Sequence, residues 1–472
     1  MPITSFSYFS LVLITFAFCS LIIKGNESKK TFLLIVSYYF YMTFDWRFSL
    51  LLLFLTLVNF YSGYVISKSS SQSLKRCSLY LSVVISLGVL FYFKYFNFFL
   101  DSFYVVLNHI GIKGQSHITE IILPLGISFI TFQAITYPID VYNNRLSKTA
   151  SLKDFSLFMA FFPQLLSGPI LRAHKFIPQL EEKTKESSQQ IITGMTLVLC
   201  GLIKKVIIAD TLALHIVDPA FDNPSELSSL FLILALFAYS FQVYMDLSGY
   251  TDIALGVAKM FGYKLPHNFN RPYMATSISN FWQRWHITMS SFFRDYLYEA
   301  VRKWHWSNIY FNLLIVFIAI GLWHGAGWNF VLYGTIHGTL VGLEHYRSKV
   351  REEKGLPPII YRGFGLFIRV LQVFTIVTLT RLLFRSETIQ SSIDYLELII
   401  TTSSTSFPMS NVAILAFTVC IICHFTPITW RDKLMRKFDG LPEYAYAASA
   451  VFIVYITAAF SNDIDSFIYF QF

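Results

Sequence analysis

Charged residues are scarce in this chain. Of its 472 residues, 14% are Asp, Glu, Lys or Arg and 54% are hydrophobic, whereas charged residues make up about 25% of an ordinary soluble domain. No polar stretch reaches the ~50 residues that a soluble domain needs at minimum. The composition therefore excludes an ordinary globular protein and predicts a single polytopic membrane domain over residues 1–472.

The sequence also lacks a concentrated basic face of the kind that binds nucleic acid. The net charge is +9, but the Lys and Arg residues are spread through short loops. Basic residues follow the first and third apolar runs, at Lys24, Lys29, Lys30, Lys68, Lys75 and Arg76. By the positive-inside rule these loops face the cytoplasm, and the N-terminus lies outside. We expect contact with membrane lipid and no nucleic-acid partner.

Cysteine is rare as well, and five cysteines lying mostly inside apolar runs favour small buried hydrophobes over a disulfide framework. Cys420, Cys423 and His424 have the spacing of a c-type haem attachment site, but they lie within the apolar run 412–425, which favours core packing. No His or Cys pair with short zinc-ligand spacing is followed by a second such pair. Glycine-rich phosphate loops and nucleophile elbows are also missing. The sequence predicts no metal site.

Long apolar runs, in contrast, recur from end to end. They cover about residues 6–23, 31–44, 48–66, 79–93, 121–139, 155–166, 191–208, 227–243, 309–321, 328–343, 364–383, 412–425 and 444–460. Several are shorter than the ~20 residues that a simple span needs, so some helices must be re-entrant, tilted or buried among others. The prediction is an all-α polytopic fold with about 10 to 13 membrane helices, plus re-entrant and surface helices.

The central third carries more polar residues than either end. Residues 264–273 contain two prolines and predict a structured loop. From Phe281 onward, aromatic and apolar side chains recur at helical steps, at 281, 285, 289, 292 and 296. Arg284 and other charged residues occupy the remaining positions. This pattern predicts an amphipathic helix at the membrane surface, with its aromatic face toward protein or lipid.

His324 follows the apolar run 309–321 and stands between Trp323 and Gly325. An ionisable group inside a bilayer costs roughly 2.5 to 3.5 kcal/mol even on a lenient scale, so a functional role is the first explanation. A neutral imidazole can accept a proton near pH 7, which suits a general base. The small residues 325–327 leave room for a substrate. The alternative is a structural histidine hydrogen-bonded between helices.

Two further histidines accompany His324. His337 lies 13 residues later, which on one continuous helix turns it about 220° away from His324. The Gly-Ala-Gly break at 325–327 weakens this argument, because the helix is expected to restart near Trp328. Packing and chemistry are equally acceptable roles for His337. His286 lies 38 residues before His324 on the predicted surface helix, and only folding could bring the two together.

The residues alone leave three classes of protein open: a membrane enzyme, a proton-coupled transporter and a haem protein. A transporter with a histidine relay would use carboxylates near the membrane midplane, for which Asp246 and Asp252 are the candidates. It would also be expected to contain inverted repeats, and none is visible in the sequence.

Five ordered motifs narrow this choice. They are LPLGISF at 123–129, PQLLSGPI at 163–170, DLSGYTDIA at 246–254, FWQRWH at 281–286 and GLWHG at 321–325. Together they resemble the membrane-bound O-acyltransferase (MBOAT) family, and most of all its bacterial alginate O-acetylase-like branch. The resemblance covers about residues 120–345, and the ending FIYFQF at 467–472 is also similar to that branch.

The resemblance implies a helical MBOAT-like fold and a transferase that moves an acyl group to a hydroxyl inside a membrane-embedded tunnel. By motif, the essential histidine is His324 and the second polar site residue is His286. His337 matches a further histidine of this branch and is a possible supporting residue, together with Trp323, Arg284, Asp246 and Asp252.

The resemblance also implies substrates and partners. No cofactor is expected to be bound permanently, and acetyl-CoA or another acetyl thioester is the expected donor. The acceptor would be an exported or cell-envelope polysaccharide, reached through a separate extracytoplasmic esterase-like acetyltransferase. The protein would lie in the bacterial cytoplasmic (inner) membrane. The nearest rival is a D-alanyl transfer protein of the teichoic-acid pathway, which takes its acyl group from a carrier protein.

Overall fold

The structure is a computed structural model that describes residues 1–112, 121–146, 148–166, 168–182, 187–304, 308–427 and scattered residues from 429 to 455. Helices and connecting loops make up this part of the chain, which contains no β-strand. The predicted all-α fold is confirmed. The motif at 467–472, Ser167 of the second motif and most of the apolar run 444–460 lie outside the described residues.

Five helical stretches are long and apolar enough to cross a membrane. They are Trp46–Lys68, Gln72–His109, Ser188–Asp222, Ser229–Met260 and Gly363–Arg385. Three shorter apolar helices accompany them, at Phe6–Leu21, Ile309–His324 and Asn411–Phe425. The protein is therefore a polytopic membrane protein in which full-length spans alternate with shorter helices, as the uneven lengths of the apolar runs predict.

The chain divides into two compact units. Unit 1 contains residues 1–199, 251–266 and 442–461, and unit 2 contains residues 200–250, 267–441 and 462–472. Two helices, α9 (Ser188–Leu202) and α12 (Ser229–Met260), contribute residues to both units. The prediction of one membrane domain over the whole chain stays a prediction.

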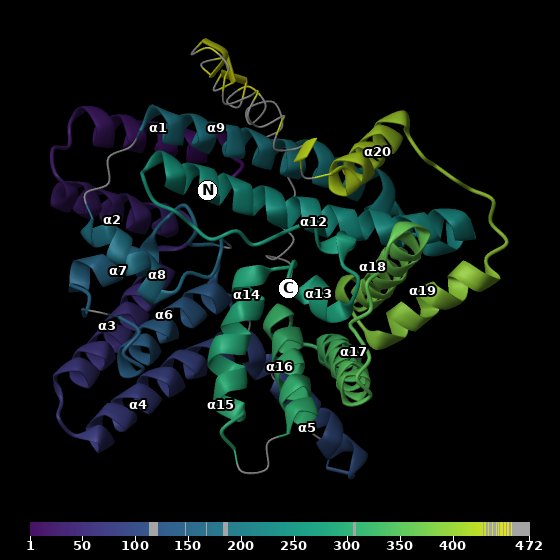
Figure 1. Cartoon of the computed structure of the whole chain (residues 1–472), viewed down its shortest axis with the longest axis horizontal. Helices are drawn as coiled ribbons and strands as arrows, with labels where there is room; N and C mark the ends of the chain where they lie inside the picture. The colour runs from purple at the N-terminus through teal and green to yellow at the C-terminus, as the bar shows by residue number, and fades with distance from the viewer. Residues whose placement is uncertain are drawn as a thin grey trace. The chain divides into compact units, whose positions relative to one another are not determined.

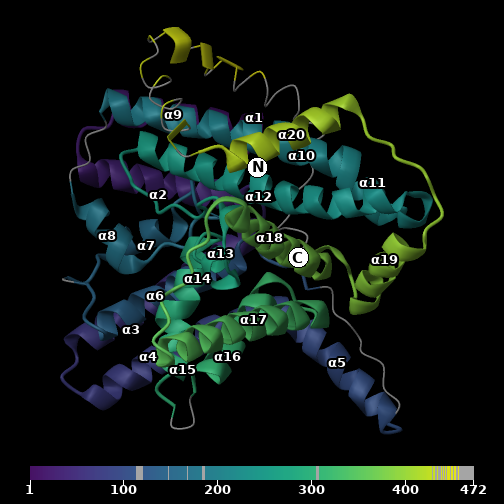
Figure 2. The same cartoon turned by 45° about the vertical axis from the view of Figure 1, so that its right-hand side comes forward.

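In unit 1, capping side chains fix the starts of α1, α3 and α4. Asp45, for example, accepts a hydrogen bond from the backbone N–H of Arg47 at 2.9 Å, which satisfies a donor at the start of α3. Helices α3, α4 and α6 lie side by side (Figures 1 and 2). The elements are α1 (Phe6–Leu21), α2 (Asn26–Met42), α3 (Trp46–Lys68), α4 (Gln72–Leu90), η1 (Phe91–Tyr95), α5 (Phe96–His109), α6 (Ile127–Tyr142), α7 (Leu152–Ala160) and α8 (Ala173–Glu181).

Short buried helices form the centre of unit 1. Nearly every residue of α6 is buried, although the helix has only 16 residues. Helix α7 has nine residues, and its buried Asp154 pairs with Lys30 of α2 at 2.6 Å. Such helices are covered by protein on most sides, which confirms the prediction that some of the apolar runs are buried among other helices.

Unit 2 contains the histidine region. Its first segments follow α9 directly and include two π-helical stretches. The elements are η2 (Ile203–Ala209), α10 (Asp210–Leu212), η3 (Ala213–Val217), α11 (Asp218–Asp222), η4 (Pro224–Glu226), η5 (Pro272–Met274), α13 (Ile278–Trp282), α14 (Ile287–Phe292), η6 (Phe293–Tyr298), α15 (Glu299–Val301), α16 (Ile309–His324), α17 (Trp328–Glu353), α18 (Gly363–Arg385), α19 (Ile389–Thr401) and α20 (Asn411–Phe425). The predicted structured loop at 264–273 is confirmed, since it is irregular up to η5.

Helices α16 and α17 form a tightly packed antiparallel hairpin (Figure 2). Glycines make the close approach possible: a Cβ at Gly321 would overlap the backbone carbonyl oxygen of Phe330, and a Cβ at Gly334 would overlap that of Phe317. Small residues at such a contact let two membrane helices pack backbone against backbone. The hairpin holds the end of α16, where His324 lies, in a fixed place relative to α17.

Candidate active site

His324 is the last residue of α16 and is only 2% exposed. The helix stops there because Gly325 is extended, with φ −156°, and Gly327 caps the start of α17. The predicted break at 325–327, with a new helix from Trp328, is thus confirmed. The break therefore places the imidazole at the C-terminal end of α16, inside unit 2.

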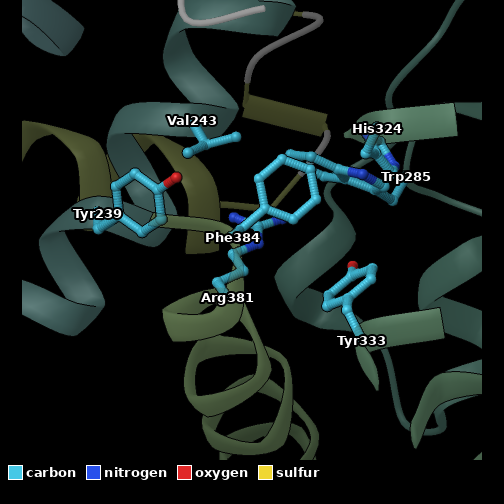
Figure 3. A pocket seen from close by; sticks show the side chains of 7 residues that line it. All are labelled: Tyr239, Val243, Trp285, His324, Tyr333, Arg381 and Phe384. Carbon is cyan, nitrogen blue, oxygen red and sulfur yellow. The ribbon is translucent and has the colours of Figure 1, made fainter. Parts of the chain in front are cut away.

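A small cavity lies beside His324 (Figure 3). Its lining comes from α12, α16, α17, α18 and the segment before α14, and consists of Tyr239, Val243, Trp285, His324, Tyr333, Arg381 and Phe384. The rings of His324 and Phe384 are 4.7 Å apart. The cavity volume is about 10 Å³, near the minimum for one water molecule. Side chains must therefore move before a substrate can reach the imidazole.

Trp323 contacts both of the histidines predicted to be catalytic. Its ring centroid lies 4.8 Å from that of His324 and 5.4 Å from that of His286. The fold thus brings His286 close to the His324 region, but His286 does not line the cavity, whereas its neighbour Trp285 does. The roles of His286 and Trp323 in catalysis stay predictions.

The prediction of one amphipathic surface helix from Phe281 onward is wrong. Helix α13 ends at Trp282, and α14 begins at Ile287. The intervening turn pairs with the preceding loop, because Asn270 N–H donates to the carbonyl of Arg284 at 2.9 Å and Ile287 N–H donates to that of Asn268 at 2.8 Å. These long-range hydrogen bonds replace the hydrogen bonds of a continuous helix, so the helix can break without leaving the backbone groups unsatisfied.

His286 lies in this turn and has left-handed backbone angles, with φ 44° and ψ 52°. Such angles are uncommon for a residue other than glycine and are tolerated best by Asn, Asp and His. The side chain is 2% exposed rather than on a surface helix. The turn lies outside the five candidate spans, and burial lowers the pKa of His286 to about 3, so its ring is neutral at pH 7.

We expect His286→Ala to reduce the acyl transfer that the sequence resemblance implies by about 100-fold or more, the scale of a lost acid or base group. The measurement is ester-bound acyl group per cell, normalised to protein abundance in the membrane. His286→Asn is the matched variant, because Asn tolerates the left-handed backbone but lacks the imidazole. Wild-type acyl transfer in both variants would remove His286 from the site.

His337 connects three elements of unit 2. Its Nδ1 accepts a hydrogen bond from the Trp282 indole at 3.2 Å, so the proton is on Nε2, which donates to the Thr380 hydroxyl at 3.0 Å. That hydroxyl in turn donates to the carbonyl of Val377. Both ring nitrogens are thus engaged between α13, α17 and α18. His337 does not line the cavity, but its ring lies 4.4 Å from that of Tyr333, which does.

None of the remaining predicted supporting residues lines the cavity. The Arg284 side chain donates to Asn280 at 3.0 Å. Asp246 is buried on α12 and pairs with Lys205 at 3.0 Å. Asp252 is on the same helix in the part that belongs to unit 1. Within the described residues, no group of three or more His, Cys, Asp or Glu side chains is arranged to hold a metal ion.

Sequence reasoning missed most of the cavity lining. Tyr239 and Tyr333 are far from each other in the chain and far from Arg381 and Phe384, and they meet only through the packing of α12, α17 and α18. One of them did leave a signal. Arg381 is a charged residue inside the apolar run 364–383, where a cation is as unusual as the histidine at 324.

The fold and the cavity define the class: a polytopic, all-helical membrane protein with a buried histidine at a helix break. Comparison with known proteins gives the family. The chain belongs to the membrane-bound O-acyltransferase family, whose model matches residues 33–384. It is therefore an O-acyltransferase, and this membership sets aside both the transporter and the haem protein.

Three relatives illustrate the similarity. The chain is 36% identical over 376 residues to the "Probable alginate O-acetylase AlgI" of Pseudomonas aeruginosa, covering 78% of this chain and 69% of that protein. It is 33% identical over 403 residues to the peptidoglycan O-acetyltransferase of Helicobacter pylori, covering 79% and 74%. It is 31% identical over 275 residues to the teichoic acid D-alanyltransferase of Bacillus subtilis, covering 55% and 68%. The chain spans about two thirds of the length of the alginate O-acetylases that it matches.

Proposed function

We propose that this protein is an O-acetyltransferase of the bacterial inner membrane that acts in the O-acetylation of an exported or cell-envelope polysaccharide. The observation that carries the proposal is the contrast among its relatives. Alginate and peptidoglycan O-acetylases match 78% and 79% of the chain at 36% and 33% identity, whereas a D-alanyltransferase matches 55% of it at 31%.

The proposed donor is a cytoplasmic acetyl thioester such as acetyl-CoA, used as a substrate and not as a bound cofactor. Two features of the site support a short acyl group. The cavity beside His324 is small, and aromatic side chains surround it closely. A two-carbon acyl group needs less displacement of these side chains than a long fatty acyl chain.

In the proposed reaction, His324 acts as the general base. Its imidazole takes the proton from the attacking hydroxyl as the oxygen adds to the thioester carbonyl, and it then returns the proton to the departing thiolate. The product is an acetyl ester and a free thiol. Burial of the ring keeps water away from the reacting atoms.

The proposed acceptor route includes a second protein. We propose an extracytoplasmic esterase-like acetyltransferase that receives the acetyl group and completes the modification of the polysaccharide. The relatives named as alginate and peptidoglycan O-acetylating enzymes support a glycan as the final acceptor.

The test is a deletion of the gene followed by complementation with the wild-type chain. Envelope polysaccharides are treated with mild alkali, and the released acetate and D-alanine are quantified. Loss of ester-bound acetate with unchanged D-alanine supports the proposal. Loss of D-alanine with unchanged acetate would favour the D-alanyl transfer protein instead, as would a neighbouring gene for a carrier protein and its ligase.

A further inference from the structure

Arg381 of α18 is a buried cation in the cavity beside His324. It is 3% exposed and lies within a helix apolar enough to span a membrane. A buried charge is costly unless opposite charge or well-placed polar groups compensate it. The question is therefore which group compensates the charge of Arg381 in this cavity.

The partners of Arg381 within the described part of the chain are all neutral. Nη1 donates to the carbonyl of Ser240 at 2.9 Å and to the hydroxyl of Tyr273. The guanidinium carbon lies 4.1 Å from the centre of the Trp285 ring, a cation–π contact. No carboxylate of the described residues lies within ion-pair distance. These contacts hold the guanidinium in place but leave its charge uncompensated.

The guanidinium also has unused donors. It carries five N–H groups, and among the described residues only those on Nη1 have a hydrogen-bond partner. Arg381 lines the same cavity as His324 and Tyr239, and Figure 3 draws its head group between Tyr239 and Tyr333. The cavity is thus lined by a base and by a positively charged hydrogen-bond donor.

Tyr239 supplies a second buried hydrogen-bond donor in this cavity. It is 1% exposed and lines the cavity. Its hydroxyl has no hydrogen-bond partner among the residues that the structure describes. A buried hydroxyl without a partner is costly and points to a ligand that would complete its hydrogen bonding.

We propose that Arg381 is a catalytic residue that donates hydrogen bonds to the carbonyl oxygen of the acyl thioester in this cavity, with the Tyr239 hydroxyl as a second donor. This inference rests on the proposed function. As the acceptor oxygen forms its bond to the carbonyl carbon, the C=O electron pair moves onto the carbonyl oxygen, where Arg381 stabilises the negative charge. The proton goes to His324, the C–S bond then breaks, and the thiolate leaves with that proton.

The test uses membranes containing Arg381→Gln, Arg381→Lys or the control Arg385→Gln, assayed with radiolabelled acetyl-CoA and the endogenous acceptor. Arg385 lies one turn further along α18 and pairs with Asp218 instead of lining the cavity. We expect Arg381→Gln to lower kcat by about 100-fold or more, as for removal of other oxyanion donors. The KM for acetyl-CoA and the melting temperature should change little, whereas a purely structural role would lower the melting temperature and leave kcat intact.

Each outcome decides the proposal. Arg381→Gln with kcat within threefold of wild type would overturn it. If that variant does not fold, Arg381→Lys decides instead: it keeps the charge but loses the planar fork, so a fall in kcat of about tenfold supports the proposal and a wild-type kcat overturns it. Wild-type membranes that transfer D-alanyl but not acetyl would contradict the proposed function alone, and the same variants would then be compared with the D-alanyl donor.

Discussion

Replacing His324 with alanine is expected to abolish the proposed polysaccharide acetylation while the protein remains folded and abundant in the membrane. The imidazole is the group beside the cavity that can accept a proton from the attacking hydroxyl at neutral pH. Loss of a general base costs about 10² to 10⁴ in rate, which would leave about 1% or less of the wild-type acetylation rate. The measurement is ester-bound acetate in a deletion strain that expresses the variant.

Two controls make this result specific. His267→Ala changes an exposed histidine of the same unit and should acetylate at the wild-type level. A thermal unfolding curve of the purified His324→Ala protein should match that of the wild type. Retained acetylation in His324→Ala would refute the assignment of the base, whereas a large loss of protein would show that His324 is needed for folding.

Gly321→Ala should lower both the stability and the activity of the protein. The added Cβ would overlap the carbonyl oxygen of Phe330, a backbone atom that cannot rotate away. Overpacking typically costs about 1 to 3 kcal/mol, and His324 lies less than one helical turn further on. We therefore expect a melting temperature lower by several degrees together with a strong loss of acetylation.

Gly342→Ala is the matched control in the same hairpin. A Cβ at Gly342 would meet the Tyr310 ring at 3.6 Å, an ordinary van der Waals distance. Its melting temperature and acetylation should be close to those of the wild type. If Gly321→Ala behaved in the same way, the backbone contact between α16 and α17 would not be what positions His324.

The sequence was informative wherever the residues of a single helix or loop were enough to predict its structure. The apolar run 309–321 and the restart at Trp328 predicted α16, α17 and the break between them, and the motif 321–325 drew attention to His324. Helix propensity and apolar periodicity are local properties, so these elements could be predicted without knowing what packs against them.

The sequence was less informative where distant segments pair with one another. The turn at His286 exists because the backbone of residues 268 and 270 forms hydrogen bonds with it. The helical spacing of apolar residues at 281–296 cannot reveal these long-range hydrogen bonds. Arg381 and Tyr239 join His324 only through packing of helices far apart in the chain. Tyr239 looks ordinary in sequence, since most buried tyrosines serve only in packing, and the unusual position of Arg381 in an apolar run does not reveal which residues it meets.

The glycine contacts of α16 and α17 also determine how the site can open. Because the two backbones touch at Gly321 and Gly334, the helices cannot slide past each other without a clash, so His324 and Tyr333 must move together as one rigid body. If the site opens by movement of helices, the residues that move are on other elements, such as Phe384 and Arg381 of α18. Distances between spin labels on α16 and α17 should then be the same with and without the proposed donor, acetyl-CoA, while distances from either helix to α18 should change.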